Sequence, residues 1–355
     1  MEEKRERTEA ETEQERNDLR DLIFRLCFVP GNSGDELSAS KAAAAELAAL
    51  GETEIDSVGN VYMHFGKKDA KEHILLDAHI DQIGLIITGI DEDGFLSVDA
   101  CGGMDKRLMP GSAVTVYGKE KLNGIVCCMP PHLMKGEEKL LPVNELHVDL
   151  GLPEEEVRRL VSPGDRALMW MKPKMLLNGR LSSGALDDRA GCASLIRCAQ
   201  LLKEEKISCR VTVLLSCDEE VNGRGARTGG FRMNPTQAVV VDVGFAAQPG
   251  VPETMSQPLG AGPTIGFAPI LDGEMSRRFV SLAEENGIPY KADVCGGRTY
   301  TNSEAVAVVG SGVRTALISI SLCYMHSAIE TIDLEDVENT ARLIAAYIKE
   351  VGSRG

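Results

Sequence analysis

Four short apolar, mostly β-branched runs are the clearest pattern along the chain, and each leads into ionisable residues. The runs and the residues after them are Ile74–Ala78 with His79, Val211–Leu215 with Asp218-Glu219-Glu220, Ala238–Val241 with Asp242, and Ala316–Ile320 with His326. Near-continuous apolar runs of this length are typical of strands that helices cover on both faces. Helical periodicity occurs over residues 190–205, 275–286 and 334–351, with Asp333 as the cap of the last helix. This alternation predicts an α/β fold with a doubly wound, mostly parallel sheet and helices on both faces.

The positions of the ionisable residues predict where a site lies. In doubly wound sheets, ligands bind beyond the carboxyl ends of the strands. We therefore expect the residues that follow the four runs to converge on one site.

Residues 82–176 show a different pattern, with short alternating segments and tight turns. Residues 85–90 and 95–98 flank Asp91–Gly94 and predict a hairpin, and residues 112–117 and 125–128 predict strands around a turn at 119–124. Residues 153–161 predict a helix whose first turn holds three glutamates. The pattern predicts a small β-barrel or sandwich inserted between residues 21–81 and 177–355, which together form the α/β domain. Residues 1–20 carry eight acids and five bases and predict a solvated or frayed helical extension.

Composition excludes several classes of partner. The net charge of −16 disfavours nucleic acid and anionic membranes, and the 4% aromatic content leaves little material for stacking on bases or sugars. The ten cysteines form no CxxC pair, no stretch approaches 18 consecutive apolar residues, and the N-terminus lacks the order of a secretion signal. We expect a cytoplasmic protein with reduced thiols.

His79-Ile80-Asp81 and Asp187 are two candidate parts of a metal site. Residues i and i+2 of an extended chain share a face, so Asp81 is placed to hold the imidazole of His79 in one tautomer. Asp187 opens an apolar helix, where it could simply cap the helix. A carboxylate at that position can also offer one oxygen to each of two cations.

Glu219-Glu220 is the most informative dipeptide. Two adjacent buried carboxylates repel each other unless cations neutralise them. With a metal pair present, one glutamate can bind metal while the other acts as general base and then general acid. The alternative is an acidic solvent loop, and we interpret the following Gly223–Gly230 segment as a flexible turn. The chain contains no GxSxG, GxxxxGK[ST] or HExxH motif.

The order of these residues resembles that of the cocatalytic dinuclear-metal exopeptidases, and within them the tetrahedral aminopeptidase family. That family includes glutamyl and deblocking aminopeptidases and members historically named endoglucanases. The resemblance extends from about residue 20 to near the end of the chain, and its motifs are Pro30–Gly34, His79-x-Asp81, Ala185–Gly191, Glu219-Glu220, Arg224–Ala226, Asp242 and Tyr324–Ser327. The insertion also resembles that family's dimerisation domain, and it separates His79 from Asp187 by 108 residues, whereas sister carboxypeptidases and amidohydrolases keep the two close.

The resemblance implies a function and a set of roles. One metal ion would be held by His79, Asp187 and Asp242, the other by Asp187, Glu220 and His326, with Glu219 as catalytic base. The family usually takes zinc or cobalt; imidazole and carboxylate ligands also suit manganese. It further implies peptide substrates and a homo-oligomer built from dimers, up to a tetrahedral dodecamer. The alternatives are an endoglucanase-type glycoside hydrolase, a deacylase or carboxypeptidase of a sister family, and a noncatalytic peptide-binding scaffold.

Overall fold

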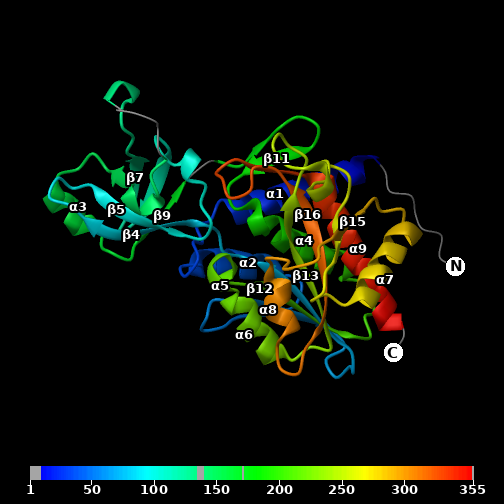
Figure 1. The fold of residues 1–355 in the computed structure, drawn as a ribbon. Coiled ribbons are helices and arrows are strands. Elements are labelled where there is room, and N and C mark those ends of the chain that lie inside the picture. The colour runs from blue at the N-terminus through cyan, green and yellow to red at the C-terminus, as the bar shows by residue number, and fades with distance from the viewer. Residues whose placement is uncertain (1–8, 134–139, 170–171, 354–355) are drawn as a thin grey trace.

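The computed structural model describes residues 9–133, 140–169 and 172–353 and shows an α/β domain from which a β-barrel projects (Figure 1). Residues 1–8 of the predicted extension lie outside the described residues. The predicted fold class, an α/β sheet with an inserted barrel, is confirmed.

The four predicted apolar runs are adjacent, parallel strands at the centre of an eight-stranded sheet. Their order is β12 (Arg210–Ser216), β3 (His73–His79), β13 (Gln237–Phe245) and β16 (Arg314–Leu322). Strand β3 is buried along its whole length, as its apolar sequence requires. The carboxyl ends of all four strands therefore meet at one edge of the sheet.

The outer strands make the sheet mixed rather than uniformly parallel. Strands β1 (Glu52–Ile55) and β2 (Val61–Gly66) are antiparallel to each other, and β2 is antiparallel to β12. At the other edge β14 (Thr264–Phe267) is antiparallel to β16 and parallel to β15 (Lys291–Val294). The predicted parallel arrangement thus holds for the centre of the sheet, where the site lies.

Helices cover both faces of the sheet. Alternate residues of the central strands contribute to two separate cores, as the two-residue period of a strand requires. The larger core joins the sheet to α1 (Glu9–Cys27), α2 (Leu37–Leu47), α4 (Leu186–Leu202), α7 (Gly273–Glu285) and α9 (Leu334–Ser353). The smaller core joins the opposite face to α6 (Arg224–Met233) and α8 (Asn302–Ala307).

Helix α6 corrects one expectation from the sequence, because Gly223–Gly230 is not a flexible turn. Its glycines allow close packing: a Cβ on Gly225 would lie 2.3 Å from the carbonyl oxygen of Cys217, and one on Gly229 would lie 2.6 Å from Leu214. The glycines therefore bring this helix against the sheet rather than making the segment loose.

The barrel consists of six strands in the closed order β4-β5-β8-β7-β6-β9. Their bounds are β4 Gly84–Ile90, β5 Leu96–Cys101, β6 Ala113–Tyr117, β7 Lys121–Val126, β8 His147–Asp149 and β9 Arg166–Met169. The predicted hairpin is β4 and β5, and α3 (Glu154–Leu160) is the predicted helix. Strand β7 begins at Lys121, so the predicted turn at 119–124 is shorter than expected. Residues such as Leu85, Val116 and Val148 form the barrel's own buried core.

A three-stranded sheet lies beside the site. It contains β10 (Lys174–Met175), β11 (Arg180–Ser183) and β17 (Glu330–Asp333) in that order.

Helix α1 continues through residue 20 without a break, so the first described part of the predicted extension belongs to a longer helix. The division into domains stays a prediction, with all six barrel strands inside residues 82–176.

Within the described residues, no helix is both long and apolar enough to cross a membrane.

Candidate metal centre

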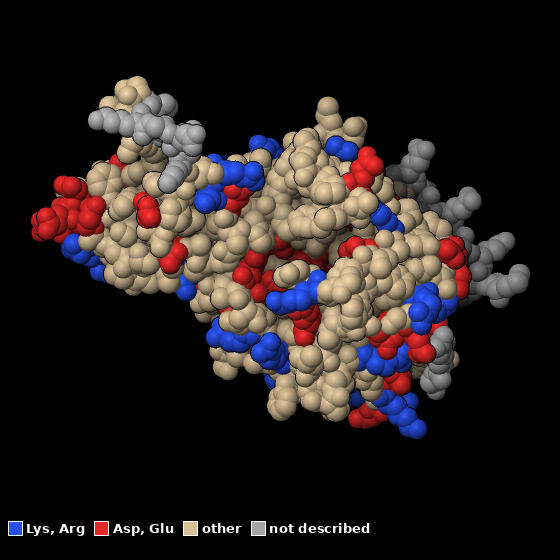
Figure 2. All heavy atoms as spheres, in the orientation of Figure 1, with Lys and Arg blue, Asp and Glu red and all other residues tan. Residues whose placement is uncertain are grey.

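The sequence-predicted residues converge at the carboxyl edge of the central strands. His79 ends β3, Asp242 lies in β13, and Glu219 and Glu220 form the start of the short helix α5 (Glu219–Asn222) that follows β12. Asp187 lies at the start of α4, and His326 lies in the loop after β16. Figure 2 shows acidic side chains gathered in a hollow at the centre of the molecule, close to where the barrel joins the α/β domain.

Asp187 lies between the two histidines. Its Oδ1 is 3.0 Å from His79 Nε2, and its Oδ2 is 3.4 Å from His326 Nε2. Two sets of possible ligand atoms share this carboxylate, namely His79, Asp187 and Asp242 in one set and Asp187, Glu220 and His326 in the other. Within each set the atoms lie within 4.8 Å of one another. The structure therefore places a carboxylate where it can serve two cations at once.

Asp81 supports His79 and α5 together. His79 Nδ1 donates to the backbone oxygen of Asp81 at 3.2 Å and lies 3.4 Å from Asp81 Oδ1, which leaves Nε2 facing Asp187. The Asp81 carboxylate also accepts from the amides of Glu219 and Glu220 and from Ser33 Oγ. Burial raises the pKa of Asp81, but its contacts with His79 and these donors outweigh burial and hold the pKa below its usual range.

The two glutamates occupy different positions. Glu220 Oε2 lies 3.4 Å from His326 Nε2, and Glu220 Oε1 is buried with no hydrogen-bond partner among the described residues. Glu219 belongs to neither set of ligand atoms but lines the same cavity. Burial raises the pKa of Glu219 to about 7 and raises that of Glu220 well above its ordinary value.

The imidazole of His326 is oriented by the barrel. Its Nδ1 donates to the carbonyl oxygen of Gly103 at 2.6 Å, so Nε2 is the nitrogen that faces Asp187 and Glu220. Burial lowers the pKa of His326, but the contact with Asp187 and the charge of Glu220 raise it to about 9 overall.

Two buried carboxylates near the site were missed from the sequence. Glu330 accepts the amide hydrogens of both Asp187 and His326. Asp77 lies inside the apolar strand β3, and burial raises its pKa to about 7. A carboxylate in the middle of an apolar run was a signal for Asp77, whereas Glu330 is the first residue of an ordinary short strand and gave none.

The donor set fits divalent metal ions. Five carboxylates, those of Asp81, Asp187, Glu219, Glu220 and Asp242, gather around two imidazoles. Burial raises the pKa of Asp242 and Glu220, and the charge of Asp187 raises both further, so cations would offset the cost of holding these carboxylates together. Imidazole and carboxylate ligands without a thiolate suit zinc, cobalt or manganese.

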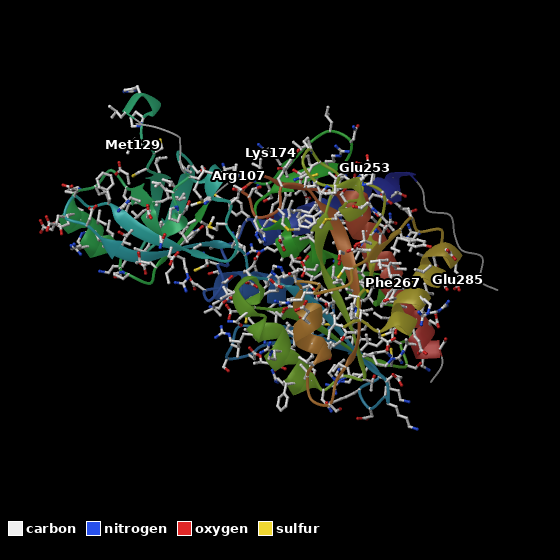
Figure 3. The ribbon with its side chains drawn as sticks, in the orientation of Figure 1. Arg107, Met129, Lys174, Glu253, Phe267 and Glu285 are labelled. Carbon is white, nitrogen blue, oxygen red and sulfur yellow. The ribbon has the colours of Figure 1, made fainter. Side chains whose placement is uncertain are left out.

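The cluster opens into a cavity of about 940 Å³. Outside the cluster, its charged lining residues are two arginines and two acids: Arg227, Arg298, Asp293 and Glu304. Arg298 forms an ion pair with Glu304 at 2.7 Å. Much of the remaining wall is apolar and includes Phe267 of β14, labelled in Figure 3. The cavity thus combines a strongly acidic part with a wall of balanced charge.

One family model matches most of this chain. The M42 glutamyl aminopeptidase family matches residues 59–343. The lysyl aminopeptidase of Pyrococcus furiosus is 29% identical over 342 residues, which cover 93% of this chain and 97% of that protein.

Solved structures give the same result. An aminopeptidase from the archaeon Desulfurococcus kamchatkensis has a TM-score of 0.88 and 31% identity, covering 94% of this chain and 95% of that one. The TET1 peptidase of Pyrococcus horikoshii, described as able to assemble into a tetrahedron or a large octahedral shell, has a TM-score of 0.83 and 31% identity, covering 93% and 99%.

Proposed function

This chain belongs to the M42 glutamyl aminopeptidase family and is a peptide hydrolase, and from that premise we propose that it is a dinuclear-metal aminopeptidase acting on short peptides. The observation that carries the proposal is the position of Asp187, whose two oxygens face two histidines from opposite ends of the chain. A carboxylate in this position can bind one cation with each of its oxygens.

The proposed ligands follow from the two sets of atoms. His79, Asp187 and Asp242 hold one ion, and Asp187, Glu220 and His326 hold the other. When bound, such a pair of ions supplies Lewis acidity towards the scissile carbonyl and lowers the pKa of water. Zinc or cobalt is the proposed metal, with manganese as a chemically suitable third choice.

Glu219 is the proposed base. Its carboxylate lines the cavity beside the ligands but belongs to neither set, so both of its oxygens are available for a proton. Its backbone amide is held by Asp81, which fixes the start of α5 against β3. In this position Glu219 takes a proton from the attacking water and delivers it to the leaving amine.

The cavity wall supports a neutral, apolar N-terminal residue as the proposed substrate side chain. Five large side chains of the wall are 46% to 77% exposed: Val221, Phe245, Met255, Val294 and Tyr300. Large exposed apolar groups gathered in one cavity are typical of binding surfaces. The wall outside the cluster holds two positive and two negative side chains. It therefore has no net positive charge to attract a glutamate side chain and no net negative charge to attract a lysine side chain.

The alternative functions have weaker support. Two carboxylates suffice for glycoside hydrolysis, so that reaction does not need two sets of metal ligands. Some related structures carry the name endoglucanase, but this chain matches a peptidase family over most of its length, and the family match is the stronger observation. The same match disfavours a deacylase or carboxypeptidase of a sister family.

We also propose a homo-oligomer. The barrel exposes five large apolar side chains by 46% to 61%: Ile125, Met129, Leu133, Leu140 and Leu141. Met129 lies at the top of the barrel in the view of Figure 3. The proposed building block is a dimer and the proposed complete particle is a tetrahedral dodecamer. The exposed apolar groups of the barrel support this, as do the dodecamer and the tetrahedron described for related structures. A cytoplasmic location stays a prediction.

Metal analysis paired with peptidase assays tests the proposal. The purified protein should contain two divalent ions per subunit and release amines from aminoacyl anilides. A chelator should remove both the ions and the activity, and zinc or cobalt should restore them. Activity that survives complete metal removal would refute the proposal.

A further inference from the structure

We propose that Glu330 is a positioning residue that sets the distance between the shared ligand Asp187 and the second histidine His326. Its two carboxylate oxygens accept one backbone amide hydrogen each, Oε2 from Asp187 at 3.2 Å and Oε1 from His326 at 3.0 Å. The side chain is 2% exposed. One carboxylate thus ties together two segments that belong to different parts of the chain. This inference rests on the metal sites of the proposed function.

The position of Glu330 in the fold makes this contact rigid. It is the first residue of β17 and pairs with Ser183 of β11, the strand that leads directly to Asp187. On its other side, Thr331 bridges to Cys323 at the end of β16, so the loop that carries His326 is closed at its base. Glu330 therefore lies at the base of the loop that carries His326 and beside the end of the strand that leads to Asp187.

The backbone of the His326 loop needs such support. His326 and Tyr324 both have a φ of +61°, a region that residues other than glycine rarely adopt. Such conformations persist only where surrounding contacts fix them. The Nδ1 contact with Gly103 orients the imidazole ring, and the amide contact with Glu330 holds the backbone from which the ring extends.

Glutamine provides the sharpest substitution. It has the size of glutamate, but its single oxygen accepts only one of the two amides, and its NH₂ group faces the other donor. In Glu330→Gln the segments of Asp187 and His326 are no longer held by one group. The ion bound by Asp187, Glu220 and His326 should bind more weakly than the ion bound by His79, Asp187 and Asp242, because only the former depends on His326.

Asp336 offers a matched control. This carboxylate of α9 is fully buried and also accepts two backbone amides, from Gly260 at 2.8 Å and Gly262 at 2.7 Å. It belongs to neither set of ligand atoms. Asp336→Asn therefore removes the same kind of double acceptor without touching the metal centre.

Calorimetric titration of the metal-free, full-length proteins with Co²⁺ tests the inference. Wild type and Asp336→Asn should bind two ions alike, and in Glu330→Gln the weaker dissociation constant should rise about 10- to 100-fold. The melting temperature of metal-free Glu330→Gln should fall no further than that of Asp336→Asn, and excess Co²⁺ should restore its activity. If Glu330→Gln does not fold, Glu330→Asp, which is too short to reach both amides, should show the same weakening.

The outcomes separate the two proposals. Binding of both ions by the Glu330 variant as tightly as by wild type would overturn the positioning role. Equal weakening in Asp336→Asn would also overturn it, because the effect would then be general destabilisation. Failure of wild type to bind two ions would instead refute the proposed function.

Discussion

His326 Nδ1 lies 2.6 Å from the carbonyl oxygen of Gly103, so a loop of the barrel orients a histidine of the α/β domain. The approach is possible because Gly103 has no side chain: a Cβ there would lie 2.9 Å from this nitrogen and 3.1 Å from the neighbouring ring carbon. The inserted module therefore contributes directly to the geometry of the candidate metal centre.

Gly103→Ala should weaken metal binding at the His326 set. The added methyl group displaces the imidazole from Gly103 by a few tenths of an ångström or more, which misaligns Nε2 with Asp187 and Glu220. We expect an affinity loss of about 10-fold or more for the second ion, measured by metal titration. Gly89→Ala is the control, since its nearest neighbour, Ser97 Cβ, lies 3.8 Å away. Unchanged binding in Gly103→Ala would show that the barrel contact does not orient His326.

Arg189→Met should destabilise the fold. The guanidinium is fully buried and donates to the backbone oxygens of Ile80, Leu26 and Val29, which joins α1 to the end of β3. Methionine fills the space but leaves these acceptors unpaired, which lowers the free energy of unfolding. Removing the buried charge offsets part of this loss, and we expect a net loss of about 2–4 kcal/mol. Denaturant unfolding of the metal-free protein measures the loss. Arg107→Met, at an exposed side chain, should leave stability nearly unchanged.

The centre of the fold and the convergence of the candidate residues could be predicted from the sequence because both depend on local signals. The roles of these residues stay proposals. Each central strand is an apolar run, and each run leads to the residues that the structure brings together. His79 and Asp242 are placed directly by their strands, since a parallel strand fixes where its end lies. The distance between these two residues depends on the order of the strands in the sheet and not on how far apart the residues are in the sequence.

Other features could not be predicted because their cause is long-range. Helix α6 contains glycines that usually mark a turn, and only the contacts with Cys217 and Leu214 explain why glycine is required there. Glu330 acts through two amides, one of them 143 residues away, and no periodicity records such a contact. The same applies to Gly103, whose role depends on how the barrel meets the α/β domain.

As the pH falls from 6.5 to 4, the free energy of unfolding should decrease, and part of this decrease should come from His73. Burial, Arg210 and His64 lower the pKa of His73 from 6.5 to about 4. The unfolded chain therefore binds a proton in this range that the folded protein does not, so stability rises with pH through the window and is complete above 6.5. We expect His73→Gln to lose about 1–2 kcal/mol less than wild type on acidification from pH 7 to 5.

Urea unfolding of the two metal-free proteins at both pH values makes this comparison. The absence of metal matters because acid also protonates the ligands. Equal acid sensitivity of wild type and His73→Gln would contradict the assignment.

The apolar cavity wall predicts substrate preference. Among aminoacyl anilides, leucine, methionine and phenylalanine should give the highest kcat/KM, with glutamate and lysine at least about 10-fold lower, since a charged side chain finds no unbalanced partner in the wall. Val294→Asp should shift the preference towards lysine, whereas Val308→Asp, at an exposed valine outside the cavity lining, should not. A wild-type preference for glutamate or lysine would contradict this part of the account.

The central claim is that two metal ions and the Glu219 carboxylate together cleave the peptide bond, and Glu219→Gln tests it most directly. The amide keeps the size of the side chain but cannot accept the proton, and Glu219 belongs to neither set of metal ligands. Metal content and kcat should be measured on the same preparation. We predict two ions per subunit with kcat reduced about 10³-fold or more. Two bound ions with wild-type turnover would contradict it.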